Sequence, residues 1–216
     1  MITTLRNRPN TQQSLRRAAW AGENSQNYVL WNTPAMTGMR RGEALALRWR
    51  DIDLDAGTIS VRRSAGMVRV ADESAEVVEG STKTNKPRVV DLDGQAAAVL
   101  RGWKRERGLM ALQLVAPGVL VFGSIEGQHR NPEHTSRQFT RDVERCGLVP
   151  GIRLHDLRHT HATLLLLARV PVHVVSQRLG HASATITMTV YAHVLPGNQQ
   201  EAADTFARLV KGANPA

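Results

Sequence analysis

The chain has 216 residues, a formal net charge of +9 and a sequence pI near 10.9. This length can bury a full hydrophobic core, so we expect one domain with at most a small appendage. No apolar run approaches the ~20 residues that a membrane-spanning helix needs. The single cysteine, Cys146, excludes an internal disulfide and fits a reducing cytoplasm; we expect it to be a small buried hydrophobe.

The positive charge is distributed unevenly along the chain. Residues 1–50 carry eight basic and two acidic side chains, whereas residues 51–150 carry fourteen of each. A charge that served only solubility would be spread more evenly, so the distribution favours a polyanionic partner such as nucleic acid. Ribosomal and membrane-surface proteins can be equally basic, so charge alone does not decide. The chain has neither a P-loop nor a GxGxxG signature, and we therefore expect no nucleotide cofactor.

The N-terminal quarter of the chain divides into a leader and two expected helices. Residues 1–26 are mostly polar and show no period, so we expect an arm that is disordered or atypical. Helical apolar spacing predicts a helix over residues 27–36. Pro34 lies inside it and should kink or end that helix, because an interior proline costs about 3 kcal/mol. A second helix is expected within residues 37–49, after the tight entry that Gly38 allows.

The middle of the chain predicts strands followed by helices. Residues 51–92 alternate apolar and polar side chains around turns, which indicates a small antiparallel sheet. Helices are expected over residues 93–108 and 136–146, with a short buried run ending at Gly123 between them. The expected core contacts of these helices are Ala97, Leu100, either Leu109 or Met110, Phe139 and Val143.

The C-terminal third carries the unusual side chains. His155 and Arg158 stand three residues apart at the start of an apolar run, so a helix places them on one face. Pro171 and Gly180 mark the ends of a second helix. The segment 183–191 alternates threonine with apolar residues, and its period favours a strand. A terminal amphipathic helix is predicted over residues 198–211, with an apolar stripe formed by Ala202, Phe206, Leu209 and Val210.

Four motifs in a fixed order carry a family resemblance. They are TGMRRGEALALRW at 37–49, STKTNKPRVVDL at 81–92, LHDLRHTHAT at 154–163, and LGH at 179–181 with a tyrosine ten residues after its histidine. Over roughly residues 28–211, the chain resembles the tyrosine recombinases of the phage integrase family. Each motif alone is a weak signal, whereas four in register are a strong one.

The resemblance implies a fold and a domain organisation. The fold is α+β, mainly α-helical with a small three-stranded antiparallel sheet, and the catalytic domain covers residues 27–216. The family's separate N-terminal core-binding domain is expected to be absent, with only the arm before the catalytic domain. The resemblance also places Tyr191 on a helix, against the strand-like period of its segment, and we follow the resemblance there.

The resemblance further implies a set of site residues. They are Arg40, Lys83, His155, Arg158, His181 and Tyr191 as catalytic residues, with Glu43 in support. The two arginines would clamp a DNA phosphate, since a guanidinium stays protonated and binds phosphate through two N–H groups. Tyr191 would attack phosphorus and form a covalent 3′-phosphotyrosine, with His155 as the base.

The remaining implied roles complete the strand transfer. His181 would donate a hydrogen bond to the phosphate, and Lys83 would protonate the leaving 5′-oxygen. Lys86 lies close enough to compete for the role of Lys83. Glu43 would orient Arg40 through a charge-assisted hydrogen bond; the alternative is an ordinary surface ion pair worth under about 1 kcal/mol.

The implied function is that of a site-specific DNA recombinase or integrase with no metal or other cofactor. We expect it to act on double-stranded DNA in the cytoplasm, associated with the nucleoid, as a homo-oligomer (a tetramer) joined through the C-terminal helix. One alternative is a truncated DNA-binding remnant without recombination activity. Another is a zinc hydrolase that uses the two histidines of HDLRH with His181 or His193. Asp156 in place of a catalytic glutamate, and Arg158 beside the metal, weigh against the hydrolase.

Overall fold

The computed structural model describes residues 27–69, 75–82, 87–147, 151–192 and 199–212. The expected N-terminal arm, residues 1–26, lies outside the described residues, as do Lys83 and Lys86. The helices are α2 (Tyr28–Thr37), α3 (Arg41–Leu45), α4 (Gly94–Met110), α5 (Pro132–Arg145), α6 (Leu154–Leu167), α7 (Val172–Leu179), α8 (Ala184–Tyr191) and α9 (Gln199–Gly212), with short 3-10 turns η2 (Trp49–Asp51) and η3 (Leu112–Val115).

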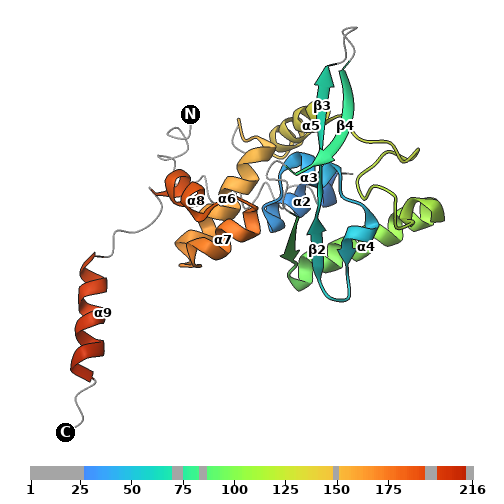
Figure 1. The fold of residues 1–216 in the computed structure, drawn as a ribbon. Coiled ribbons are helices and arrows are strands. Elements are labelled where there is room, and N and C mark those ends of the chain that lie inside the picture. The colour runs from blue at the N-terminus through green and yellow to red at the C-terminus, as the bar shows by residue number, and fades with distance from the viewer. Residues whose placement is uncertain (1–26, 70–74, 83–86, 148–150, 193–198, 213–216) are drawn as a thin grey trace.

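The strands confirm the expected small antiparallel sheet and add a ribbon to it. They are β1 (Ile52–Asp53), β2 (Thr58–Val61), β3 (Arg63–Arg69), β4 (Ala75–Ser81) and β5 (Arg88–Asp91). The three-stranded sheet has the order β1-β2-β5, and Ile59 of β2 lies opposite Val90 of β5. A separate hairpin of β3 and β4 extends away from this sheet (Figure 1). The α+β fold, mainly helical, is as predicted.

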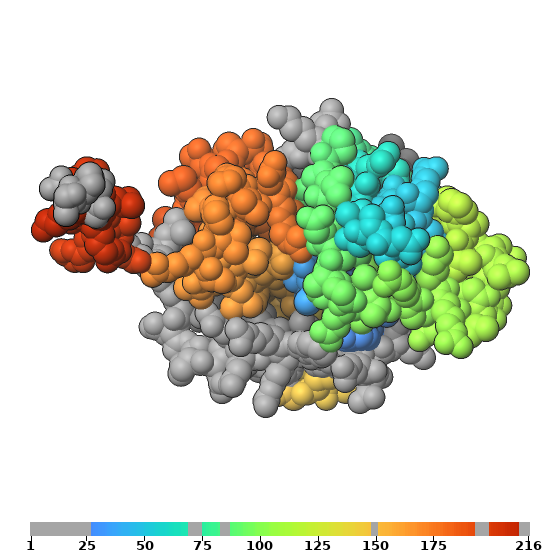
Figure 2. All heavy atoms as spheres, turned by 90° about the horizontal axis from the view of Figure 1, so that it is seen from below, coloured from blue at the N-terminus to red at the C-terminus, as the bar shows by residue number. Residues whose placement is uncertain are grey.

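The hydrophobic core divides into two clusters. The larger one lies between the sheet and helices α2 to α5, and its fully buried side chains include Trp31, Ile59, Leu100 and Phe139. The smaller one joins α6, α7 and α8. The space-filling view shows these three helices, in orange, as a mass of their own beside the green and cyan residues of α4 and the sheet (Figure 2). Helix α6 contributes Leu154 and Leu157 to the larger cluster and Ala162 and Leu166 to the smaller one, so it connects the two clusters.

Helix α2 continues through Pro34 to Thr37, so of the two expected outcomes, a kink or an end, the proline does not end the helix. Two side-chain hydroxyls accompany the proline: Thr33 donates to the carbonyl of Val29 at 2.8 Å, and Thr37 donates to that of Thr33 at 2.5 Å. These bonds add to the backbone ladder where proline supplies no N–H. Gly38 then terminates the helix with a φ of 69°.

Two expectations about burial were wrong. Leu109 and Met110 are 78% and 64% exposed, because Arg107 takes the inward position in the last turn of α4 and donates to the carbonyl of Ser124 at 2.9 Å. An arginine can fill such a position because its aliphatic stem packs while its head group finds a carbonyl. Cys146, expected to be buried, is exposed at the C-cap of α5.

The segment 184–191 is a helix, as the resemblance implied and its alternation did not. Thr187 and Tyr191 are its buried residues, and their spacing of four places them on one helical face. The burial of that face against α6 and α7 outweighs the low helix propensity of the β-branched residues.

Helix α9 matches the predicted terminal helix, and its apolar stripe faces solvent. Phe206, Leu209 and Val210 are 69%, 69% and 56% exposed. Figure 1 shows α9 set apart from the other helices. Arg169, which follows α6, forms an ion pair with Glu201 of α9 at 2.7 Å. None of the helices in the described ranges has the length and apolar composition to cross a membrane.

Two phenylalanines provide a matched test of this packing. Phe139→Ala should lower the free energy of unfolding by about 3–5 kcal/mol, because it leaves a cavity in the core. Phe206→Ala should change it by less than about 0.5 kcal/mol, since the ring is exposed. Urea unfolding followed by circular dichroism measures both. A loss in Phe206→Ala that approaches that of Phe139→Ala would show that α9 packs on its own domain.

Candidate active site

Arg158 lies at the junction of three helices. From α6, its Nη1 donates to the carbonyl of Gly38 at 2.6 Å and its Nη2 donates to the carbonyl of Leu179 at 2.7 Å. The residue is 3% exposed. Burial, followed by the charge of Arg40, lowers the pKa of Arg158 to about 9, so it remains protonated at pH 7. The guanidinium therefore ties the end of α2 to the end of α7 and keeps its charge.

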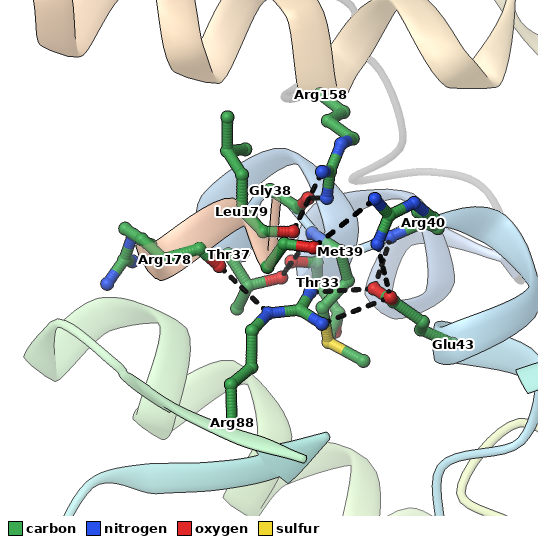
Figure 3. A network of polar contacts seen from close by, with 11 residues as sticks. Thr33, Thr37, Gly38, Met39, Arg40, Glu43, Arg88, Arg158, Arg178 and Leu179 are labelled. Atoms are coloured by element: carbon green, nitrogen blue, oxygen red, sulfur yellow. Dashed lines mark hydrogen bonds and ion pairs between the residues drawn. The ribbon is translucent and has the colours of Figure 1, made fainter. Parts of the chain in front are cut away.

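Arg40 is held by the buried carboxylate of Glu43. Its backbone N–H donates to Oε2 of Glu43 and its Nη1 donates to Oε1, both at 2.8 Å. Its Nη2 also reaches the carbonyl of Gly180 at 3.5 Å. The side chain of Arg40 is 23% exposed, whereas that of Glu43 is fully buried. The pair thus joins a buried carboxylate, that of Glu43, to the partly exposed guanidinium of Arg40, and it is not an ordinary surface ion pair (Figure 3).

Tyr191 is buried at the end of α8. Its hydroxyl lies 2.9 Å from Nδ1 of His159, and the residue is 3% exposed. Burial raises the pKa of Tyr191 to about 12, although the nearby charge of Arg158 acts in the opposite direction. In this arrangement the phenol is protonated and shielded from solvent.

His159 is the site residue that sequence reasoning missed as a partner of the tyrosine. It lies one helical turn after His155 on α6, and the two rings meet edge to face with their centroids 4.8 Å apart. His155 is exposed, and His159 is half-buried against Tyr191. The sequence did contain a signal for His159: positions i and i+4 share a helical face, so His159 lies on the same face as His155. The zinc-hydrolase alternative had already grouped these two histidines.

His181 follows the left-handed turn at Gly180, whose φ is 67°. Its Nδ1 lies 2.7 Å from the hydroxyl oxygen of Thr187 in α8. Burial, followed by the charges of Arg158 and Arg40, lowers the pKa of His181 to about 4. His181 is therefore neutral at pH 7 and linked to the helix that carries Tyr191.

The structure brings five of the six expected catalytic residues to one region, with Glu43 behind them. Arg40, Arg158 and His181 interact electrostatically, and Arg158 also acts on Tyr191. His155 reaches this group through His159. Lys83 falls outside the described residues, so its place is not assigned. Guanidinium groups beside neutral imidazoles and a phenol can bind a phosphate and accept or donate a proton at it.

The described residues do not form the metal site that the zinc-hydrolase alternative requires. Within these ranges no group of three or more His, Cys, Asp or Glu side chains could hold a metal ion. One ring nitrogen of His159 is already engaged by the tyrosine hydroxyl, and the positive charge of Arg158, which acts on both histidines of HDLRH, would repel a metal cation there. His193, one of the suggested third ligands, lies outside the described residues.

Comparison with known proteins points to the phage integrase family. The model of the phage integrase family matches residues 21–198. A tyrosine recombinase XerC-like protein of Caldanaerobacter subterraneus is 32% identical over 184 residues, which cover 80% of this chain and 47% of the relative. The ICEBs1 integrase of Bacillus subtilis is 32% identical over 182 residues, which cover 81% of this chain and 47% of the relative. The chain spans about half the length of these curated relatives.

Solved structures show the same fold. The Tn1549 transposon integrase, in complex with transposon right end DNA, superimposes with a TM-score of 0.69 at 18% identity. The match covers 94% of this chain and 65% of that one. At this identity the likeness concerns the fold.

The lowered pKa of His181 can be tested by NMR titration of its ring proton. We expect a midpoint near pH 4 in the folded chain and near the ordinary value of about 6.5 in the unfolded chain. The stability that depends on neutral His181 is then present above pH 6.5 and lost as the pH falls towards 4. Arg158→Gln should raise the midpoint, because it removes the second cause of the shift. A midpoint of 6.5 in the folded wild-type chain would contradict the arrangement.

Proposed function

Because the chain belongs to the phage integrase family, we propose that it is a site-specific tyrosine recombinase that cleaves and rejoins DNA strands through a covalent 3′-phosphotyrosine. The observation that carries the proposal is the meeting of Arg40, Arg158 and Tyr191, from three separate parts of the chain, around one cationic site.

The two arginines suit a phosphodiester in the act of substitution. Attack on phosphorus places additional negative charge on the non-bridging oxygens, and guanidinium N–H groups stabilise that charge at fixed positions. Arg158 uses two of its five N–H groups on carbonyls, and the side chain of Arg40 is 23% exposed to solvent. Each therefore retains donors for the phosphate. Loss of one such donor typically costs ~10²–10³ in rate.

Tyr191 is the nucleophile in this proposal, and His159 is its proton acceptor. With a pKa of about 12, roughly one phenol in a hundred thousand is ionised at pH 7, so attack requires a base. Nδ1 of His159 lies 2.9 Å from the hydroxyl of Tyr191. Burial lowers the pKa of His159, which keeps the ring neutral and able to accept the phenol proton. This assignment moves the role of base from His155 to its neighbour. His155, which is exposed, is left to contact the phosphate or its flanking DNA.

The strand transfer balances without an external cofactor. The oxygen of Tyr191 forms a bond to phosphorus, and the bond from phosphorus to the 5′-oxygen breaks. The leaving oxygen takes a proton, for which Lys83 is the proposed donor by resemblance. Attack by a second 5′-hydroxyl then reverses the step and joins a new strand, since the phosphotyrosine retains the ester bond. His181 donates to the phosphate throughout.

Double-stranded DNA is the proposed partner. The net charge of +9 supports it, and the similar Tn1549 integrase is described in complex with DNA. Contacts to about six phosphates would lower affinity by roughly a thousandfold between 50 and 200 mM salt. The proposal places the reaction in the cytoplasm, on the nucleoid.

Assembly through α9 is a further part of the proposal. The exposed stripe of Phe206, Leu209 and Val210 has no cover within its own chain among the described residues. Burial of Phe206 and Leu209 on a neighbouring copy would contribute about 1.5–3 kcal/mol each, which matters at the high local concentration of adjacent DNA sites. We propose a homo-tetramer on DNA, joined in this way.

A DNA-binding remnant without recombination is the second candidate, and the burial of Tyr191 favours it. A nucleophile that is 3% exposed cannot reach a phosphate without movement of α8. The two candidates differ in one observable, namely the covalent adduct.

The adduct can be sought with a randomised library of nicked suicide duplexes, in which cleavage releases a short strand and traps the protein on DNA. We expect wild-type chain to form the adduct in the presence of EDTA. Tyr191→Phe should abolish it and leave DNA binding unchanged, since a hydroxyl and no charge is removed. Tyr28→Phe is the matched control, because Tyr28 is the other tyrosine in the sequence. No adduct with wild-type chain supports the remnant, and an adduct with Tyr191→Phe means that the nucleophile is misassigned.

The assembly proposal can be tested by truncation after residue 198. The truncated chain should keep its melting temperature within about 2 °C, because α9 buries little apolar surface on its own domain. It should lose higher-order complexes on DNA with two sites, as measured by sedimentation velocity. The double variant Phe206→Ser and Leu209→Ser should behave in the same way. A large loss of melting temperature with normal assembly would show that the helix acts within its own chain.

A further inference from the structure

Arg88, at the start of β5, occupies the centre of the polar network drawn in Figure 3. Its Nη2 and Nη1 donate to the two carboxylate oxygens of Glu43 at 2.7 Å and 3.0 Å, and its Nε donates to the carbonyl of Arg178 at 3.0 Å. The side chain is 9% exposed. All three guanidinium nitrogens of Arg88 therefore donate hydrogen bonds to oxygens of the protein, which fixes the side chain in the interior.

The carboxylate that Arg88 binds is the one that holds Arg40. Glu43 accepts from the backbone N–H and from Nη1 of Arg40, and it is buried. Burial alone would raise the pKa of Glu43, but the hydrogen bonds and charges of Arg88 and, after it, Arg40 together outweigh burial and lower the pKa. Arg88 thereby keeps Glu43 ionised, and an ionised Glu43 fixes both the backbone and the guanidinium of Arg40.

The same guanidinium supports the turn that carries His181. A Cβ built at Gly180 would lie 2.8 Å from Cδ and Nη1 of Arg88 and 3.0 Å from its Cζ. Gly180 also offers its carbonyl to Arg40 at 3.5 Å. The turn therefore lies directly on Arg88, and this close approach adds a second reason for glycine besides the positive φ of 67°.

We infer that Arg88 is a positioning residue for the proposed strand transfer: it binds Glu43 and the end of α7 together, and so fixes Arg40 and the turn before His181 relative to each other. This inference rests on the proposed function. Arg88 acts on the phosphate through Arg40, without contact to the substrate.

Arg88→Lys is the sharpest variant, because lysine keeps the charge but cannot bind both oxygens of Glu43 and the carbonyl of Arg178 together. Arg88→Gln, a neutral amide, is the second variant if the lysine variant does not fold. Arg63→Lys is the matched control. Arg63 also pairs with a buried carboxylate, that of Asp51, and lies on the neighbouring ribbon.

The first measurement needs no DNA and does not depend on the proposed function. Hydrogen exchange of the Arg40 amide, which donates to Glu43, should become about tenfold faster or more in Arg88→Lys. It should not change in Arg63→Lys, and the amide of Ile59 in the core should exchange slowly in all variants. Unchanged exchange at Arg40 would overturn the inference, whether or not the chain cleaves DNA.

The second measurement is single-turnover cleavage of suicide DNA at saturating concentration. Arg88→Lys should cleave about a hundredfold more slowly, with DNA affinity within about threefold of wild type, and Arg63→Lys should cleave normally. A 5′-phosphorothiolate, whose sulfur leaves without a proton, should not restore the rate, because the defect lies in the phosphate clamp. Full restoration would place the defect at the proton donor and overturn the inference. A wild-type chain that forms no adduct overturns the proposed function instead, and the exchange result still stands.

Discussion

The guanidinium of Arg158 is buried, and the bonds that fix it run to the backbone carbonyls of Gly38 and Leu179 rather than to a carboxylate. Carbonyls orient a cation but do not neutralise it. Around Glu43 stand three arginines, Arg40, Arg88 and Arg158, so one carboxylate faces three positive charges and two remain in excess. Arg158 joins the ends of α2 and α7 beside this excess positive charge, and an anion would complement it.

The electrostatics of the site also set the state of its other groups. The same arginines that attract an anion disfavour an imidazolium, so burial and their charges keep His181 neutral, and His159 is kept neutral chiefly by its burial. A neutral imidazole can take a proton on one nitrogen and donate from the other, which an imidazolium cannot. The cationic cluster can therefore attract an anion and also keep the imidazoles beside it able to accept a proton.

Sequence reasoning predicted the fold class and the grouping of Arg40, Arg158, His181 and Tyr191, because short motifs record which side chains must face one ligand. Local periodicity alone was misleading where tertiary packing decides, although the resemblance gave the correct helix at Tyr191. The alternation in residues 184–191 favours a strand, but burial of Thr187 and Tyr191 against α6 and α7 makes a helix. Arg107 displaced the expected leucine or methionine from the core, and the tyrosine hydroxyl pairs with His159, a contact that does not follow from spacing alone.

The position of Tyr191 has a kinetic consequence. Under the proposed function, a duplex bound to a single copy of the chain would meet a buried phenol that is hydrogen-bonded to His159 and packed against α6 and α7. Cleavage would then require the fraction of molecules in which α8 has moved. The apparent rate on any stray phosphodiester is the intrinsic rate multiplied by that fraction. A movement that costs about 3 kcal/mol would suppress such events more than a hundredfold. Under the proposed function, latency of this kind would limit cleavage of stray phosphodiesters.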